Sequence, residues 1–142
     1  MNALSNVWPR YRDNTARHLI GIARDLQQRS LHHLTEVRGY RSLRPSLGPL
    51  LSLVALAPRP LGAIAAQLSI SPQAASQLVN IGEAAGYLER QPDPTDRRTR
   101  LVALTDLGRA LVADSVEILL EFEADYRALV GIDEYAEFTR IL

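Results

Sequence analysis

The sequence contains no cysteine, and all sixteen of its cationic side chains are arginine, so lysine is absent as well. Without cysteine, the chain cannot form disulfides, thiolate zinc sites or iron–sulfur clusters, and it has no cysteine nucleophile or thiol redox sensor. The longest nearly apolar stretch, Leu47 to Ala57, is well short of the roughly 18 residues that a membrane span requires. Residues 1–20 hold no apolar run typical of a secretory signal. We therefore expect a cytoplasmic protein without a membrane partner.

Neither sign of charge is in excess, because the sequence has 16 arginines and 16 acidic residues. Its distribution is uneven: residues 1–40 carry six Arg and three acids, residues 41–108 seven and five, and residues 109–142 three and eight, giving +3, +2 and −5. An unspecific polyanion binder usually has a large basic excess. Any nucleic-acid surface on this chain must therefore be local, and it would use the planar, bidentate donors of arginine.

Apolar residues at three- to four-residue steps predict two long helices. The first extends from Pro9 to about Arg38, and its length suggests a partner helix. The second starts after Thr105, a suitable N-cap, and ends at Gly131; Asp133 is then expected to cap a last short helix. The expected apolar stripe of the second long helix comprises Leu107, Leu111, Val116, Leu119, Leu120, Tyr126 and Leu129.

Between the long helices, the pattern predicts a helix-turn-helix. A short buried helix is expected first, from Leu47, Leu50, Leu51, Val54 and Leu56, and it is followed by a breaker at residues 58–60. Two helical patterns then flank the turn at residues 69–71. Ser71 suits an N-cap, Pro72 suits the first helical position, and Gly86 suits the end of the second helix. Two short helices joined in this way are typical of a helix-turn-helix.

A β-hairpin is expected directly after the helix-turn-helix. Residues 87–90 and 100–104 read as strands, and the intervening QPDPTDRRT is rich in the turn residues Pro, Asp and Thr. A hairpin in this place is a wing. The predicted fold class is therefore mainly α (α+β), a winged helix-turn-helix lobe between long N- and C-terminal helices. The chain has no linker or repeat, and its length suffices for a core without a metal or disulfide.

The order of these elements, together with PDPTDRRTRLVALTDLGRALV at residues 92–112, resembles the MarR (multiple antibiotic resistance regulator) family. The match extends over about residues 10–142 and includes Asp96 and Arg98 in an Asp-x-Arg arrangement. The resemblance implies a single MarR-like domain whose residues 1–40 and 106–142 form dimerisation helices around a DNA-binding lobe at about residues 41–105. Ile81-Gly82 and Ser69 depart from the family pattern, and Gly82 implies either close packing or a bent helix.

The resemblance also implies an obligate homodimer on double-stranded DNA. The recognition helix of each subunit would enter successive major grooves of a pseudo-palindromic operator. A small effector, often an aromatic carboxylate or another phenolic, would bind between the dimer region and the DNA lobe and release the DNA. The sequence thus favours a repressor relieved by a ligand. The alternative is a winged-helix dimer that acts as a protein-interaction module without specific DNA binding.

Side chains suited to base edges cluster at the start of the predicted recognition helix. They are Ser71, Gln73, Ala74, Ser76, Gln77 and Asn80. A merely solvated polar face is the alternative. Because no cation lies between Pro72 and Leu88, phosphate contacts are expected from Arg59, Arg90 and the wing.

The wing carries Arg97, Arg98 and Arg100, and arginine is attracted to narrow A·T-rich minor grooves. The resemblance implies Arg98 as the main groove residue, with Asp96 orienting it or tying the wing to the body by an ion pair. A charged loop held by its own salt bridges is the alternative.

Other candidates are weaker. Trp8, Tyr11 and His33 are candidate ligand-pocket residues, although aromatic side chains at such positions often belong to the core. His18, His32 and His33 do not share a spacing that suits one metal, so neither metal nor cofactor is expected. The acidic residues at positions 117–125 have no nucleophile, His partner or phosphate loop beside them, so we do not expect an enzyme.

Overall fold

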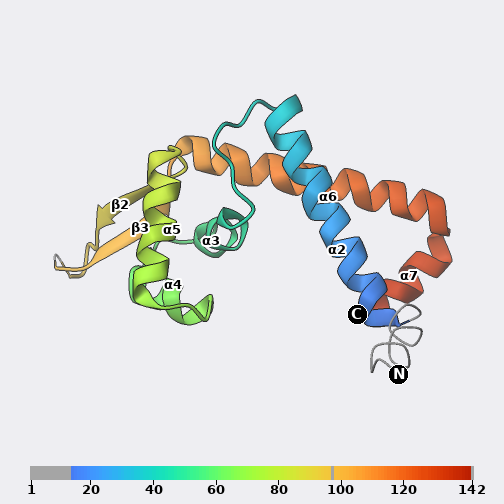
Figure 1. Ribbon diagram of the computed structural model, residues 1–142, viewed down its shortest axis with the longest axis horizontal. Coiled ribbons are helices and arrows are strands. Elements are labelled where there is room, and N and C mark those ends of the chain that lie inside the picture. Colours follow the sequence, from blue (N-terminus) through green and yellow to red (C-terminus); the bar gives the residue numbers. More distant parts are fainter. Residues whose placement is uncertain (1–13, 97, 142) are drawn as a thin grey trace, which may run out of the picture.

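The computed structural model describes residues 14–96 and 98–141. These residues form a mainly helical chain with one small sheet (Figure 1). In chain order the elements are α2 (Thr15–His32), the π-helical turn η1 (His33–Val37), α3 (Leu47–Val54), β1 (Arg59–Pro60), α4 (Leu61–Gln67), α5 (Pro72–Ala84), β2 (Leu88–Pro92), β3 (Arg100–Leu104), α6 (Asp106–Val130) and α7 (Ile132–Ile141). The predicted winged helix-turn-helix between long helices is confirmed.

The long helix α6 joins two ends of the molecule. Figure 1 shows α4, α5 and the β2–β3 hairpin at one end and α7 with the start of α2 at the other. Helix α2 has Asn14 as its N-cap, whose side chain accepts a hydrogen bond from the Ala16 backbone N–H at 2.8 Å. It continues through η1 to Val37, close to the predicted end at Arg38. The predicted start at Pro9 lies outside the described residues.

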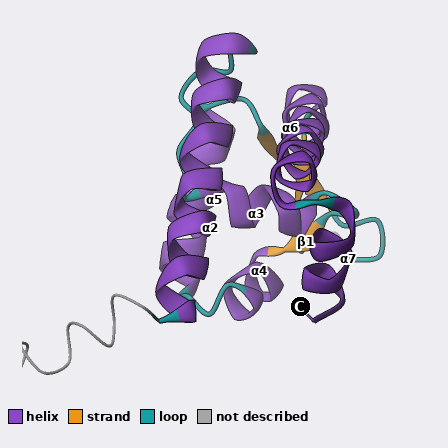
Figure 2. Ribbon diagram, turned by 90° about the vertical axis from the view of Figure 1, so that its right-hand side faces the viewer, coloured by secondary structure: helices purple, strands orange, loops and turns teal. Residues whose placement is uncertain are grey.

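The core centres on α3, which lies between α2 and α6 (Figure 2). Leu47, Leu50, Leu51 and Val54 are all buried, as their spacing predicts. The prediction for Leu56 is wrong: its side chain is 96% exposed, because the helix ends at Val54 and Leu56 falls in the following loop.

The sheet has three antiparallel strands in the order β1-β3-β2. Residues 58–60 were predicted as a breaker, yet Arg59 pairs with Val102 and Pro60 with Leu101. A proline is tolerated there because β1 is an edge strand, where the missing N–H faces away from the ladder. Strand β2 also extends two residues beyond the predicted Arg90, and Pro92 pairs with Arg100.

The helix-turn-helix has the predicted caps. The Ser71 hydroxyl accepts a hydrogen bond from the Ala74 backbone at 3.1 Å, and Pro72 occupies the first turn of α5. At the other end Gly86 has φ of +81°, and the Tyr87 N–H donates to the Gly82 carbonyl at 2.9 Å. This arrangement is a Schellman motif, which needs a residue that tolerates positive φ.

Gly82 serves close packing. Helix α5 runs unbroken through it, and a Cβ at this position would lie 2.4 Å from Cδ1 of Leu88. Leu88 is buried at the start of β2. The absence of a side chain at Gly82 therefore lets the recognition helix rest directly on the sheet.

Helix α6 begins as predicted, because the Thr105 hydroxyl accepts from the Gly108 N–H at 3.0 Å. Its predicted apolar stripe is only partly buried in the single chain, with Tyr126 half-buried against the core. Leu111 is buried, but Leu107, Val116, Leu119, Leu120 and Leu129 are 47–83% exposed, and the buried face consists of Gly108, Leu111, Ile118 and Phe122. Val116, Leu119 and Leu120 point away from the buried face, and Leu107 and Leu129 lie near the two ends of the helix, so the single chain leaves all five uncovered.

Gly131, with φ of +107°, ends α6 as predicted. The predicted capping role of Asp133 is wrong, because α7 already begins at Ile132 and Asp133 lies within its first turn. An acidic side chain there still interacts favourably with the helix dipole.

Candidate nucleic-acid interface

Helix α5 presents a narrow polar stripe to solvent. Gln73, Gln77 and Asn80 are exposed and lie at i, i+4 and i+7, so they share one face of the helix. Ala74 and Ser76 are half-buried beside this stripe, and the hydroxyl of Ser71 already caps the helix. The opposite face, with Ala75 and Val79, is fully buried. All six predicted recognition residues thus lie at or near one outward face, and their contact with DNA remains a prediction.

Asn80 is tied to the sheet through Arg90. The Arg90 guanidinium donates from Nη2 to Oδ1 of Asn80 at 2.9 Å, and from Nη1 to Oε2 of Glu83. Glu83 follows Asn80 by three residues and is therefore its neighbour on the helix face. Glu83 was not among the predicted site residues, because its contact with Arg90 depends on how β2 packs against α5. The positive charge of Arg90 is consequently paired within the protein.

The wing is shaped by its two aspartates. Asp96 accepts from the backbone N–H of Arg98 at 3.0 Å and from the Thr99 hydroxyl at 2.9 Å. Asp93 accepts from the backbone and hydroxyl of Thr95 at 2.8 and 2.6 Å, and these hydrogen bonds lower the pKa of its carboxyl. Both carboxylates therefore fold the loop back on itself, as Asx turns do.

Arg98 and Arg100 of the wing are available to bind other partners. Arg98 and Arg100 are exposed, and within the described part of the wing neither they nor Asp96 form an ion pair. Asp96 thus orients the backbone of Arg98 rather than its guanidinium, and the expected ion pair to the body does not occur among the described residues. Arg97 lies outside the described residues.

Arg59 occupies the outer edge of the sheet. Its Nε donates to the Leu53 carbonyl at 3.0 Å, and the side chain makes no further hydrogen bond to the described residues. Its terminal nitrogens therefore remain as donors near α4, and a phosphate contact through them stays a prediction.

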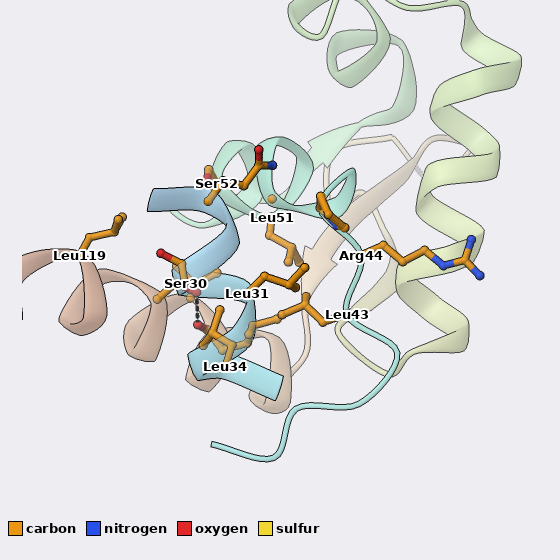
Figure 3. A pocket seen from close by; sticks show the side chains of 14 residues that line it. Ser30, Leu31, Leu34, Leu43, Arg44, Leu51, Ser52 and Leu119 are labelled. Carbon is orange, nitrogen blue, oxygen red and sulfur yellow. Dashed lines mark hydrogen bonds between the residues drawn. The ribbon is translucent and has the colours of Figure 1, made fainter. Parts of the chain in front are cut away.

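A cavity of about 180 Å³ lies between α2, α3 and α6 (Figure 3). Its wall is mostly apolar, with Leu31, Leu34 and Leu51 among the lining side chains. Ser30 also lines it, and its buried hydroxyl has no hydrogen-bond partner among the described residues. Of the predicted pocket residues, His33 does not line this cavity, and Trp8 and Tyr11 lie outside the described residues. Sequence periodicity could not locate this cavity, because it arises where three distant helices meet.

Two tyrosines connect the helical body to the lobe that carries α5. The rings of Tyr40 and Tyr87 lie 6.3 Å apart, and the Tyr87 hydroxyl donates to the Arg41 carbonyl at 2.5 Å. The Tyr40 hydroxyl donates to Asp114 of α6 at 2.9 Å. Burial and this hydrogen bond raise the pKa of Tyr40 to about 12. Because Tyr87 immediately precedes β2, this connection reaches the base of the wing.

The far end of the molecule is apolar and open. Residues of α2, α6 and α7 line a groove of about 470 Å³, namely Leu19, Ile22, Ala23, Leu26, Tyr126, Val130, Tyr135 and Phe138. Leu19, Ile22, Val130 and Phe138 are each 39–53% exposed. An apolar patch of this kind on a helical face marks an interaction site.

The described residues hold no group of three or more His, Asp or Glu side chains arranged to bind a metal. None of the helices among them is long and apolar enough to cross a membrane.

Comparison with known proteins gives a consistent result. Residues 48–99 match the sequence model of the MarR family. No curated protein matches the chain in sequence. Among solved structures, RV1404 from Mycobacterium tuberculosis is 27% identical, with a TM-score of 0.71 over 88% of this chain and 85% of that one.

Two further structures share the fold. The transcriptional repressor CouR, bound to a 23-mer DNA duplex, is 24% identical with a TM-score of 0.68, over 92% of this chain and 90% of that one. Wild-type MarR from E. coli, in its apo form, is 18% identical with a TM-score of 0.69, over 90% and 93% of the two chains.

Proposed function

We propose that this chain, whose residues 48–99 match the MarR family model, is a regulator of that family, namely a homodimeric repressor of a pseudo-palindromic operator that is relieved by a small aromatic ligand. The observation that carries this proposal is the combination of the polar stripe on α5 with the exposed Arg98 and Arg100 of the wing, which form no ion pair with the described residues. Repression is the role that CouR has by its description, and we extend it to this chain as part of the proposal.

The recognition helix and the wing would make different kinds of contact with DNA. Gln73 and Gln77 offer amide groups that suit base edges in a major groove. The β2–β3 hairpin lies beside α5 (Figure 1), and its exposed Arg98 and Arg100 would enter the adjacent minor groove or contact phosphate. Few cations take part, so the salt dependence of binding should be modest.

Dimerisation would cover the apolar groove between α2, α6 and α7. A second copy of the chain is the natural occupant, since the groove lies at the end away from the wing and both long helices contribute to it. Two copies would place two α5 helices on the same side of the DNA. For a two-fold dimer, half-sites about one helical turn apart are expected.

The effector would enter the cavity between α2, α3 and α6. An apolar cavity of about 150 Å³ is enough to hold benzene, so the volume of about 180 Å³ suits a single aromatic ring. The buried hydroxyl of Ser30, which has no partner in the part of the chain that the structure describes, would supply a polar contact inside it. A ring inserted here would change the spacing of α3 and α6, and therefore the spacing of the two recognition helices.

The proposal is tested by fluorescence anisotropy. Purified protein selects a consensus from a pool of random duplexes, and the selected duplex and a shuffled control are then titrated at two salt concentrations. We expect two chains per duplex and tight binding of the selected duplex alone. Equal, weak binding of both duplexes would contradict a sequence-specific regulator and favour a protein-interaction module.

A separate experiment tests the proposed effector site. Benzoate is added to the preformed complex of the wild type and of Ser52→Phe, which would fill the mouth of the cavity. We expect release of DNA from the wild type only. Equal release from both proteins would show that benzoate acts elsewhere.

A further inference from the structure

We propose that Arg90 is a positioning residue that turns the Asn80 amide so that only its N–H donors face DNA, which makes Asn80 select an acceptor-bearing base. The inference rests on the proposed function, since it concerns how the recognition helix reads its operator.

The contacts define a small network between the sheet and α5. Arg90 extends from β2, and its two terminal nitrogens reach Oδ1 of Asn80 at 2.9 Å and Oε2 of Glu83. The side chains of Arg90 and Glu83 are only 31% and 29% exposed. Arg90 therefore lies behind the recognition face and holds Asn80 from the protein side.

The chemistry of arginine fixes the orientation of the amide. A guanidinium carries five N–H donors and no acceptor, so the Asn80 atom that faces it must be the oxygen. The amide is planar, and its NH₂ group consequently points away from Arg90. An isolated exposed asparagine could turn by 180° to suit its target, but this one would lose a charge-assisted hydrogen bond on turning.

This orientation changes what Asn80 can read. A freely rotating asparagine pairs bidentately with adenine, using its oxygen and its NH₂ group together. With the oxygen held by Arg90, only the NH₂ group is available, and it suits guanine N7 and O6 or thymine O4. Cytosine, which presents an N4 donor in the major groove, is disfavoured.

The same network explains why Arg90 should contribute little to general affinity. Glu83 neutralises its charge at close range, and a phosphate would have to displace that carboxylate. A phosphate contact was predicted for Arg90 from the sequence, and the two roles are separable by experiment. A phosphate contact weakens binding to all sequences and lowers the salt slope by about one, whereas a positioning role changes base preference.

The test is selection from random duplexes, followed by anisotropy with each of the four bases at every position of the half-site. It compares the wild type with Asn80→Asp and Arg90→Met. Asn80→Asp keeps the pairing with Arg90 but presents an acceptor, so preference at one base pair should move to cytosine, about five-fold or more. Arg90→Met frees the amide, so preference at that same base pair should flatten or move toward adenine.

Arg140→Met is the matched control. It removes an exposed arginine that is likewise paired with a neighbouring carboxylate, that of Glu137, but on α7. Its base preferences should equal those of the wild type. Melting temperatures accompany every titration, and if Arg90→Met is poorly folded, the surface substitution Asn80→Asp decides alone.

The outcomes distinguish a failure of this inference from a failure of the proposed function. Changes at one shared base pair in both variants support the inference. Unchanged base preferences in Asn80→Asp, or uniform weakening with a lower salt slope in Arg90→Met, overturn it while leaving the proposed function intact. Selection of no consensus by the wild type overturns the proposed function, and the inference with it.

Discussion

Gly108 is the position where the fold tolerates a side chain least. It lies in the first turn of α6, where a Cβ would stand 2.1 Å from the Tyr87 carbonyl oxygen and 3.2 Å from Cδ2 of Leu104. The obstacle is backbone, and that carbonyl also accepts a hydrogen bond from the Thr105 N–H at 3.1 Å. Replacing Gly108 by alanine therefore requires α6 to move away from the sheet by about 1 Å or more, since comfortable contacts begin near 3.5 Å.

The size of the effect follows from two opposing contributions. Overpacking a well-packed core lowers the free energy of unfolding by about 1–3 kcal/mol, occasionally more. Alanine has a higher helix propensity than glycine, which offsets up to about 1 kcal/mol of this loss. Because backbone blocks the new methyl group, we expect Gly108→Ala to lose about 2 kcal/mol of unfolding free energy. For a chain of this size, that lowers the melting temperature by about 6–10 °C.

Gly62→Ala is the control for this experiment. Gly62 lies in α4 with nothing within 4 Å of the added Cβ, so the same substitution there should leave stability unchanged or raise it slightly. Both variants are melted by circular dichroism at one fixed chain concentration, because dimer stability depends on concentration. Gly108→Ala melting at or above the wild type would refute the packing argument.

Three further predictions concern binding and pH. Arg98→Ala should weaken operator binding by about 1.5–3 kcal/mol at matched salt, the range for a hydrogen bond to a charged group; unchanged affinity in anisotropy would remove Arg98 from the interface. Gln77→Ala should relax specificity at one base step by about 1–3 kcal/mol, and equal weakening on all sequences would make Gln77 a positioning residue. The raised pKa of Tyr40, about 12, means that the stability its hydroxyl supplies is complete below pH 10 and is lost as the pH rises to about 12. Tyr40→Phe should therefore melt below the wild type at pH 8 and approach it at pH 12, and a gap independent of pH would contradict this.

Local signals in the sequence predicted most of the fold. Ser71, Thr105, Gly86 and Gly131 each act through their own hydrogen bonds or backbone angles, so their roles could be inferred without tertiary information. The edge strand β1 was missed because its two residues, one of them proline, gain their strand character only by pairing with β3.

The candidate site was predictable in its residues but not in its connections. The exposed stripe of α5 follows from helical periodicity alone. The pairing of Arg90 with Asn80 and Glu83 depends on the register between β2 and α5, which no local pattern specifies. Most of the predicted apolar residues of α6 are exposed in the single chain, because a pattern of apolar residues does not say whether the same chain or another one covers them.

The central claim is that two copies of this chain read two half-sites of one operator. Hydroxyl-radical footprinting of the wild type on its selected duplex tests it most directly. We expect two protected regions, related by two-fold symmetry and centred about one helical turn apart, with flanking protection of the minor groove by the wings. A single protected region, or uniform protection along the duplex, would contradict it.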